Sequence, residues 1–179
     1  MLQKSSMFRT AEVFFSSPNK EHYLMNISRT TRLAHTSVKK NLKKLVKSGL
    51  VIESAEKKGG RKFPIYKANL SEKSFKNYKL INNLSSLLES GLIEFIEQKL
   101  APKSIVLFGS YARGEDIESS DIDLFVECKE EELGVRAFEK KLGRKIELHF
   151  MGNFSSYPKE LKNNIINGIV LMGFLEGYK

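Results

Sequence analysis

Apolar side chains in the first half of the chain recur every three to four residues, which is the repeat of a helix buried on one face. Such stretches cover residues 7–15, 23–27 and 36–48. Gly49 follows the third stretch, at the position where a helix commonly ends in the left-handed conformation. Two β-prone runs then flank Gly59-Gly60, as in a hairpin with a tight turn. The first half is therefore predicted to hold three helices and a β-hairpin.

The second half alternates between helical repeats and continuous apolar runs. Helical repeats cover residues 72–90 and 92–100. Residues 104–108 form an unbroken apolar run after the first serine, and residues 121–126 form a second strand-like segment, typical of strands buried on both faces. Residues 145–150 form a further strand-like run that contains an acid. Together with the first half, this pattern predicts an α+β protein.

Charge divides the chain into two parts. The 179 residues include 30 Lys and Arg against 21 Asp and Glu, a net charge of +9. Residues 1–80 hold 18 basic and 5 acidic side chains, a net of +13, whereas residues 81–179 hold 12 and 16, a net of −4. A polyanion is therefore the expected partner of the first half, and an ordinary solvated basic face is the alternative.

Composition also excludes several classes of protein. Cys128 is the only cysteine, which excludes a disulfide framework and a cysteine-based zinc site. The longest apolar run, residues 169–175, has seven residues, whereas a membrane span needs about 20. No charged-then-apolar leader opens the sequence. We expect a soluble cytoplasmic protein with no membrane partner.

The order of elements in residues 1–70 resembles a winged helix-turn-helix DNA-binding domain. The segments that carry the resemblance are Ile27-Ser28-Arg29-Thr30-Thr31, Leu33, Ser37-Val38, Leu42-Lys43-Lys44-Leu45 and Ser48-Gly49-Leu50-Val51. Arg32 stands where the turn usually has a glycine. Ala34 stands where the third helix usually has a Ser or Thr cap, so Thr36 is the alternative cap. The resemblance implies double-stranded DNA as partner; a scaffold for protein contacts is the alternative.

In such a domain the start of the third helix meets base edges in the major groove, and other basic side chains meet phosphates. The implied base contacts are His35, Thr36, Ser37, Lys39 and Lys40. The implied phosphate contacts are Lys43, Lys44, Lys57, Lys58, Arg61 and Lys62.

Residues 71–90 are predicted to form a linker helix before a second domain at 91–179. Its apolar stripe from Phe75 to Leu88 can pack against its own domain. Equally, it can form the seam of a homodimer, as in helix-turn-helix proteins that read two half-sites.

Two carboxylates in the second half are predicted to face one spot. Asp121 and Asp123 are two residues apart in a strand, so they share a face at about 7 Å along the chain. They would repel without a cation between them, and hard oxygen ligands suit Mg²⁺ that bridges to phosphates. Gly109-Ser110 ends the preceding strand, where backbone N–H groups and a hydroxyl can hold phosphate oxygens. A surface loop with solvated acids is the alternative.

The spacing of these residues resembles the signature of the nucleotidyltransferase fold of the DNA polymerase β superfamily, in its minimal prokaryotic members. That signature is Gly-Ser, ten residues and Asp-x-Asp, and the neighbouring Ala112-Arg113-Gly114 and Ser120-Asp121-Ile122-Asp123-Leu124 match as well. The resemblance implies a mixed sheet with flanking helices. It implies catalytic, metal-binding roles for Asp121 and Asp123, and nucleotide-binding roles for Gly109, Ser110 and Arg113.

The family also uses a third carboxylate on a neighbouring strand, and Glu147 is the candidate for this catalytic, metal-binding position. Aspartate is more usual there, and Tyr111 stands where a basic residue is frequent. His149 is two residues beyond Glu147 and so shares its face of the strand. For His149 a half-exposed structural position is favoured over a ligand role.

The chemistry implied by the resemblance is in-line attack of a hydroxyl on the α-phosphate of an NTP, with ATP as the expected donor and Mg²⁺ or Mn²⁺ as cofactor. Three functions remain open. The chain can transfer NMP to a protein or small-molecule hydroxyl, with a small helical HEPN-type protein as one acceptor. It can regulate transcription, with a domain that only senses nucleotide. It can transfer NMP to nucleic acid, which is the least favoured because the minimal domain lacks the extra domains that hold a primer.

Overall fold

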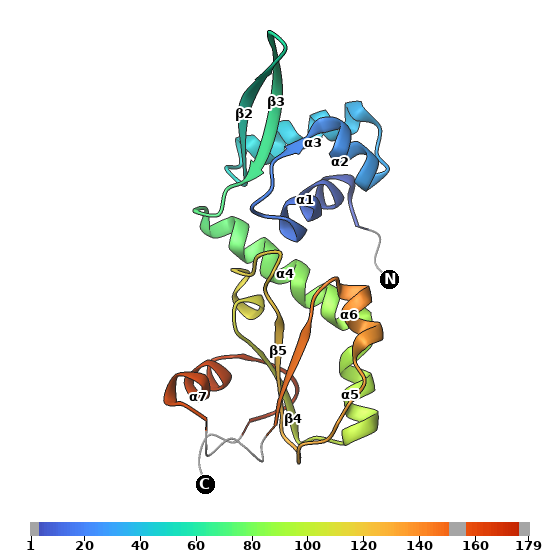
Figure 1. The fold of residues 1–179 in the computed structure, drawn as a ribbon, viewed down its shortest axis with the longest axis vertical. Coiled ribbons are helices and arrows are strands. Elements are labelled where there is room, and N and C mark those ends of the chain that lie inside the picture. Colours follow the sequence, from blue (N-terminus) through green and yellow to red (C-terminus); the bar gives the residue numbers. More distant parts are fainter. Residues whose placement is uncertain (1–3, 151–156, 176–179) are drawn as a thin grey trace. The chain divides into compact units, whose positions relative to one another are not determined.

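The computed structural model describes residues 4–150 and 157–175 (Figure 1). The chain divides into two compact units, residues 1–79 and 80–179, and the boundary falls inside α4 (Lys73–Ser90). Each unit contains one sheet with helices, so the predicted α+β class is confirmed. None of the helices in the described ranges is long and apolar enough to cross a membrane.

The first unit has the predicted order of three helices and a hairpin, with one short strand added. Its elements before α4 are α1 (Ser6–Ser16), β1 (His22–Tyr23), α2 (Leu24–Thr31), α3 (His35–Lys47), β2 (Val51–Lys58) and β3 (Arg61–Ala68). The added strand β1 pairs antiparallel with β3, which gives the sheet order β1-β3-β2. Gly59 and Gly60 at the hairpin turn have φ +55° and +79°. A two-residue turn that matches the right-handed twist of the two strands requires such positive φ values.

The core of this unit forms where the apolar faces of the three helices meet. Phe14 of α1, Ile27 of α2 and Val38 of α3 are fully buried. Leu42 and Leu45 continue the buried stripe of α3, at the spacing that leaves the lysines between them on the outside. The basic side chains of α3 are therefore excluded from the core by the helical repeat itself.

Both departures from the helix-turn-helix pattern have a structural outcome. Arg32 adopts φ +54° at the end of α2, so an arginine occupies the left-handed position where glycine is usual. The third helix begins at His35 with Ala34 as its N-cap, and no side chain caps it. The alternative that Thr36 caps this helix is therefore wrong.

The second unit contains a four-stranded mixed sheet. After the end of α4 its elements are α5 (Leu92–Leu100), β4 (Ser104–Phe108), the short 3-10 helix η1 (Tyr111–Arg113), β5 (Ile122–Val126), α6 (Arg136–Leu142), β6 (Ile146–Phe150), α7 (Lys159–Ile166) and β7 (Ile169–Gly173). The strand order is β6-β5-β4-β7; β5 and β6 are parallel, and the other pairs are antiparallel. The predicted helix and three predicted strands are present, whereas α6, α7 and β7 were not predicted.

Alternate residues of these strands enter two separate cores. Ile105 and Leu107 of β4 pack on one face with Ile122 and Leu124 of β5, α5 and part of α6. The intervening residues of β4, Val106 and Phe108, pack on the opposite face with Phe125 and α7. Asp123 lies between Ile122 and Leu124, so the period of two turns it toward this second face.

Candidate functional site

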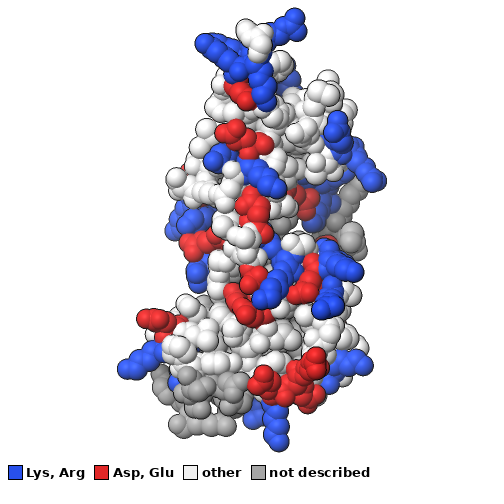
Figure 2. All heavy atoms as spheres, viewed as in Figure 1, with Lys and Arg blue, Asp and Glu red and all other residues white. Residues whose placement is uncertain are grey.

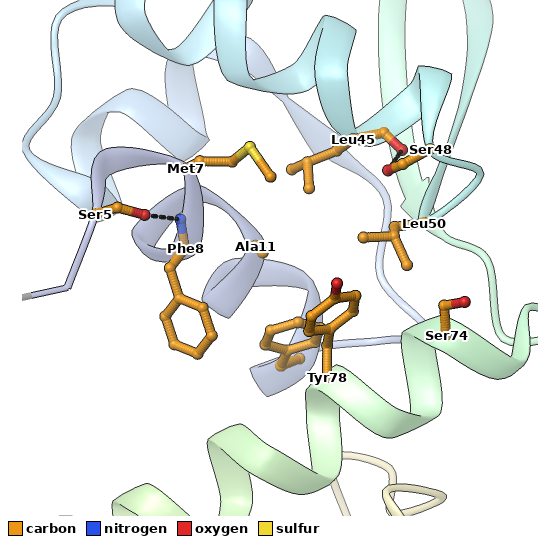
Figure 3. Close-up of a pocket in the computed structure, with 10 residues that line it drawn as sticks. Ser5, Met7, Phe8, Ala11, Leu45, Ser48, Leu50, Ser74 and Tyr78 are labelled. Atoms are coloured by element: carbon orange, nitrogen blue, oxygen red, sulfur yellow. Dashed lines mark hydrogen bonds between the residues drawn. The ribbon is translucent and has the colours of Figure 1, made fainter.

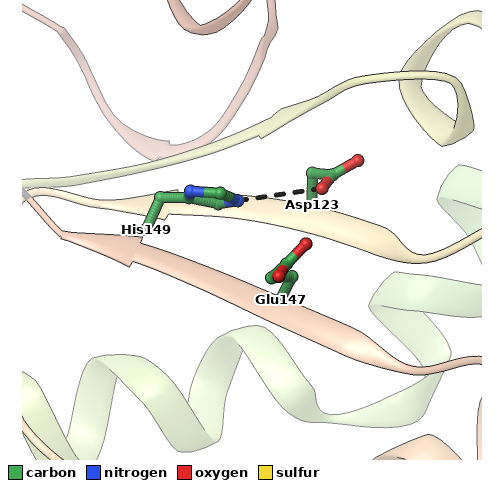
Figure 4. Close-up of side chains that lie close together, drawn as sticks. All are labelled: Asp123, Glu147 and His149. Atoms are coloured by element: carbon green, nitrogen blue, oxygen red, sulfur yellow. Dashed lines mark ion pairs between the residues drawn. The ribbon is translucent and has the colours of Figure 1, made fainter. Parts of the chain in front are cut away.

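Two carboxylates and an imidazole meet on the second face of the sheet. Asp123 of β5 and Glu147 of β6 are direct partners in the parallel register, and His149 lies two residues further along β6. Each residue offers one ligand atom, and these atoms all lie within 4.8 Å of one another. Figure 4 shows the three side chains pointing toward one another, with His149 Nε2 3.7 Å from Asp123 Oδ1. Neighbouring strands thus bring together residues 24 positions apart in the sequence.

The register that produces this cluster is fixed by burial. Ile122 and Leu124 are fully buried on the opposite face of β5, and Ile146 is buried on the opposite face of β6. A slip by one residue would turn these side chains to the wrong face and expose them, so the hydrophobic pattern specifies the pairing. The polar residues between them are held opposite each other as a consequence.

Gly109, directly after β4, lies against the carboxylate of Asp123. It has φ +74°, and a Cβ at this position would lie 2.3 Å from Asp123 Oδ2. Any other residue would therefore push the carboxylate away. In the folded chain, the glycine of the Gly-Ser motif lets the turn approach the carboxylate of Asp123 closely.

The ring of His149 is held in place by aromatic neighbours. Its centroid lies 5.1 Å from that of Phe108 and 6.2 Å from that of Tyr157, both edge-to-face. The Tyr157 hydroxyl donates to the carbonyl oxygen of Phe150 and accepts from its N–H, each at 3.1 Å. Within the described part of the chain, the buried Nε2 of His149 has no hydrogen-bond partner.

This donor set fits a divalent cation. Two carboxylates that face each other on adjacent strands supply hard oxygen ligands and negative charge. The buried Nε2 of His149, with no hydrogen-bond partner among the described residues, supplies a further donor atom directed at the same place. The turn at Gly109 leaves room for the carboxylate of Asp123 in this arrangement.

The other residues predicted for this site lie around it. Asp121 directly precedes β5 and is half-buried, and it is not part of the cluster of three. Ser110 begins the turn, where its carbonyl accepts from the N–H groups of Arg113 and Glu115. Arg113 is exposed and pairs with Glu115 at 3.0 Å. The metal role of Asp121 and the nucleotide roles of Ser110 and Arg113 stay predictions.

A buried ion pair fixes the loop between the Gly-Ser turn and β5. Asp116 is almost fully buried and contacts Arg144 at 2.9 Å, and Asn83 Nδ2 donates to the same carboxylate at 2.7 Å. Arg144 also donates to the backbone carbonyls of Ile117 and Ser120. The sequence carries no signal for this pair, because nothing in it separates Asp116 from the acids beside it.

Tyr111 is part of the core of the second unit. It is 4% exposed, and burial, together with the nearby charge of Asp116, raises the pKa of its hydroxyl to about 12. Its backbone carbonyl accepts from Asn83 Nδ2 at 3.0 Å. The buried Tyr111 therefore stabilises the turn from inside.

The first unit presents the predicted DNA-contacting side chains on two elements. Thr36, Lys39, Lys40 and Lys43 are exposed on α3, and Ser37 is half-buried. Lys58, Arg61 and Lys62 are exposed at the hairpin tip, where Figure 2 shows Lys and Arg side chains gathered.

One of these side chains, Lys58, is already engaged by side chains of β1 and β2 in the same sheet. Lys58 contacts the Tyr23 hydroxyl at 2.8 Å and the Glu56 carboxylate at 3.1 Å, and these partners raise the pKa of its ammonium group. Its charge is therefore less available to an external phosphate than those of Arg61 and Lys62.

The first unit also contains a cavity of about 290 Å³ (Figure 3). Its walls are mostly apolar and include Met7, Phe8, Ala11, Phe15, Leu45, Leu50 and Tyr78, with hydroxyls at Ser5, Ser48 and Ser74. Among the residues that the structure describes, no carboxylate, imidazole or amine lines it. The described walls of this cavity therefore differ in chemistry from the cluster of Asp123, Glu147 and His149.

Comparison with known proteins agrees with the geometry of the second unit. Residues 89–171 match the family described as "Nucleotidyltransferase domain". "Putative protein adenylyltransferase MJ1379" of Methanocaldococcus jannaschii is 43% identical over 63 residues, which cover 31% of this chain and 63% of that protein. "Putative protein adenylyltransferase MJ1305" of the same organism is 36% identical over 110 residues, which cover 56% of this chain and 71% of that protein.

A solved structure described as "Possible transcriptional regulator from Methanosarcina mazei Go1" is 20% identical, with a TM-score of 0.38, and covers 52% of this chain and 79% of its own. Similarity at that level supports no conclusion. The chain is 36% identical to the second relative and covers 71% of it, and residues 89–171 match the family itself. The chain therefore belongs to the nucleotidyltransferase domain family, in agreement with the facing carboxylates.

Proposed function

We propose that the second unit transfers a nucleoside monophosphate from an NTP to a hydroxyl of a protein or small molecule. The observation that carries this proposal is the pairing of Asp123 with Glu147 against the turn at Gly109. The names of the relatives point to a protein acceptor and to ATP as the donor. A small helical HEPN-type protein is one candidate acceptor.

The roles of the residues follow from their positions. Asp123 and Glu147, with Asp121 beside β5, would hold Mg²⁺ or Mn²⁺. When bound, such an ion supplies positive charge that stabilises the charge developing on the phosphate. Backbone N–H groups at Gly109 and the hydroxyl of Ser110 would position the triphosphate.

The transfer itself is an in-line displacement. The acceptor oxygen bonds to the α-phosphorus, the bond to the bridging oxygen breaks, and pyrophosphate leaves. Glu147 is exposed, so its carboxylate can take the proton that the hydroxyl loses. Catalysis then comes from position and charge and involves no covalent enzyme intermediate.

Label transfer tests this proposal. The full chain is incubated with α-labelled ATP, a divalent ion and candidate acceptors: the chain itself, small helical proteins and oligonucleotides. We expect label on protein, and at least about 100-fold less with Asp123→Asn or Glu147→Gln. The exposed Glu132→Gln is the matched control and should behave as wild type. Absence of transfer to any acceptor would favour a nucleotide sensor instead, and label only on the oligonucleotide would favour a nucleic-acid acceptor.

We further propose that the first unit is a winged helix-turn-helix domain that binds double-stranded DNA. This proposal is supported by the exposed lysines of α3 and the basic hairpin tip, in a half of the chain with net charge +13. With 5–8 phosphate contacts, log K should fall with log salt at a slope of about −0.9 per contact.

Charge reversal separates DNA contacts from general electrostatics. In fluorescence anisotropy with duplex DNA, Arg61→Glu or Lys62→Glu should weaken binding and reduce the salt slope by about 1 each. Lys58→Glu should have a smaller effect, because Glu56 and Tyr23 already engage that ammonium. The exposed Lys99→Glu in the second unit makes the same charge change and should have little effect. Equal losses in all four variants, or a slope near zero, would refute the assigned surface.

Homodimer formation through α4 stays a prediction. Phe75, the first residue of the predicted stripe, is buried, whereas Tyr78, Ile81 and Leu88 are 48%, 55% and 48% exposed. Sedimentation of the full chain at micromolar concentration tests it, and Ile81→Lys should then lower the association constant. A monomer without DNA would remove the prediction.

A further inference from the structure

We propose that His149 is a nitrogen ligand of the metal site, so that the site prefers a first-row transition ion such as Mn²⁺ or Co²⁺ to Mg²⁺. This inference rests on the proposed function only in requiring that the facing carboxylates bind a divalent ion. It reverses the interpretation of His149 as a purely structural side chain.

The position of Nε2 is the first support. It is buried, it lies 3.7 Å from Asp123 Oδ1, and it has no hydrogen-bond partner among the residues that the structure describes. A buried polar nitrogen in that state costs free energy unless something binds it. A shared ion satisfies the nitrogen and the carboxylate together.

The distances allow such sharing. Metal–nitrogen and metal–oxygen bonds of about 2.1 Å let two ligand atoms up to roughly 4.2 Å apart contact one ion. The 3.7 Å between Nε2 and Asp123 Oδ1 is within that limit. Within the cluster, ligand atoms lie up to 4.8 Å apart. The side chain of Glu147 is exposed, so it can rotate and bring its carboxylate within bonding distance of the same ion.

The surroundings of the ring are the second support. Phe108 and Tyr157 lie against His149 edge-to-face, and Tyr157 is itself fixed by two hydrogen bonds to the backbone of Phe150. The imidazole is therefore held with Nε2 toward Asp123 and Glu147 (Figure 4). A ligand held in its binding orientation loses little rotamer freedom when the ion binds.

The chemistry of the donor atoms gives the selectivity. Mg²⁺ binds oxygen ligands and keeps several waters, whereas imidazole suits transition ions, and affinity for mixed nitrogen and oxygen sites rises along the first row. Two carboxylates alone would favour Mg²⁺ for its abundance. Replacing a water by the His149 nitrogen shifts the preference toward ions that bind imidazole well.

A different role for His149 makes a different prediction. As a hydrogen-bonding partner that only orients Asp123, the imidazole would act on every ion through the same carboxylate. Its removal would then lower the affinities for Mg²⁺ and Mn²⁺ by equal factors. The ratio of the two affinities separates a ligand from a positioning residue.

Direct metal binding to the full chain without nucleotide tests the proposal. Mn²⁺ and Mg²⁺ dissociation constants are measured by titration of the Mn²⁺ EPR signal and by Mg²⁺ competition, and pulsed EPR reports ¹⁴N coupled to bound Mn²⁺. His149→Phe keeps a ring between Phe108 and Tyr157 but has no nitrogen, and His149→Gln keeps a hydrogen-bonding group. We expect ¹⁴N coupling only in wild type. We also expect a loss of at least about tenfold in Mn²⁺ affinity in both variants, with Mg²⁺ affinity changed less than about threefold.

The possible failures are distinguishable. Mn²⁺ binding without ¹⁴N coupling, or equal losses for Mg²⁺ and Mn²⁺, would overturn the ligand role of His149 and leave the proposed transferase site intact. Wild type that binds neither ion at millimolar concentration would overturn this inference and the metal-holding role of Asp123 and Glu147 together. Circular dichroism of each variant shows whether a loss of binding reflects loss of fold.

Discussion

Substitution of Gly109 by alanine is the sharpest test of the site geometry. The new Cβ would lie 2.3 Å from Asp123 Oδ2 and 3.1 Å from its Cγ. Ordinary contact begins at 3.4 Å, so the carboxylate oxygen must move by roughly 1 Å. The atom in the way is the end of a rotatable side chain, so the fold can yield by displacing Asp123. A displacement of this size at a reacting centre costs about 100-fold in rate, or about 2.7 kcal/mol of transition-state stabilisation.

Backbone strain adds a separate cost. Gly109 has φ +74°, and a left-handed conformation costs a residue with a Cβ about 1–2 kcal/mol. Gly143 in the same unit has φ +66° but has open space around its Cβ direction. Gly143→Ala therefore carries the strain without the clash, which makes it the matched control.

The assay compares both variants in denaturant unfolding, Mn²⁺ binding and label transfer. Both should lose about 1–2 kcal/mol of unfolding free energy. Only Gly109→Ala should lose metal affinity and transfer. Wild-type Mn²⁺ binding and transfer in a folded Gly109→Ala protein would refute the argument that this glycine sets the place of the Asp123 carboxylate.

Further perturbations address the parts around the site. Arg144→Met removes the cation that pairs with the buried carboxylate of Asp116 and should lower the free energy of unfolding by about 3–5 kcal/mol, measured with denaturant. Adding Asp116→Asn should recover much of this loss. If the double variant instead loses the sum of the two single losses, the pairing is contradicted. The pKa of Tyr111 in the folded state is raised above its unfolded value near 10, so the free energy of unfolding should fall by on the order of 2 kcal/mol as pH rises from about 10 to 12. Tyr111→Phe should flatten that part of the curve of unfolding free energy against pH. An unchanged slope would show that the hydroxyl is not buried in solution. Arg32→Gly should raise the stability of the first unit by about 0.5–1 kcal/mol, because glycine removes the left-handed strain but adds unfolded-state entropy; a lower melting temperature would show that the arginine side chain contributes more than the strain costs. Ala34→Ser should stabilise α3 by about 1 kcal/mol through a new side-chain cap, and no gain would indicate that the cap geometry is not reached.

Local patterns in the sequence were sufficient for the elements that carry the site. The period of two in 121–126 and the acid at Glu147 predicted which side chains share a face, and the apolar run of β4 predicted where the Gly109 turn begins. The family resemblance implies a third carboxylate on a neighbouring strand, with Glu147 as the candidate. The direct pairing of Asp123 with Glu147 in a parallel register comes from the structure.

What the sequence did not predict depends on contacts between distant segments. The sequence favours a structural role for His149, because its place on a face of β6 says nothing of the side chains of Phe108 and Tyr157 that orient its ring. The Asp116–Arg144 pair joins residues 28 positions apart with no periodic signal. The strand β7 lies within the apolar run 169–175, which is too short for a membrane span and shows no partner strand in the sequence, and α7 precedes it at Lys159–Ile166.

The convergence of Asp121 with Asp123 depends on more than periodicity. Asp121 lies directly before the first residue of β5 and is half-buried, and it is not among the three residues whose ligand atoms lie within 4.8 Å of one another. The period of two describes side-chain direction within a strand. Convergence of Asp121 and Asp123 on a bound ion therefore stays a prediction.

The anchoring of the loop before β5 by Arg144 has a thermodynamic consequence for the nucleotide binding that we propose. A loop that becomes ordered only when ligand arrives loses conformational entropy at that step and buries new surface, which appears as a large negative heat-capacity change. Here the loop is already ordered by a buried ion pair and by backbone carbonyls bonded to a guanidinium. Calorimetry of Mg²⁺–ATP binding should therefore give a small heat-capacity change, and Arg144→Lys, which loses the forked geometry, should make it more negative as the loop comes to fold with its ligand.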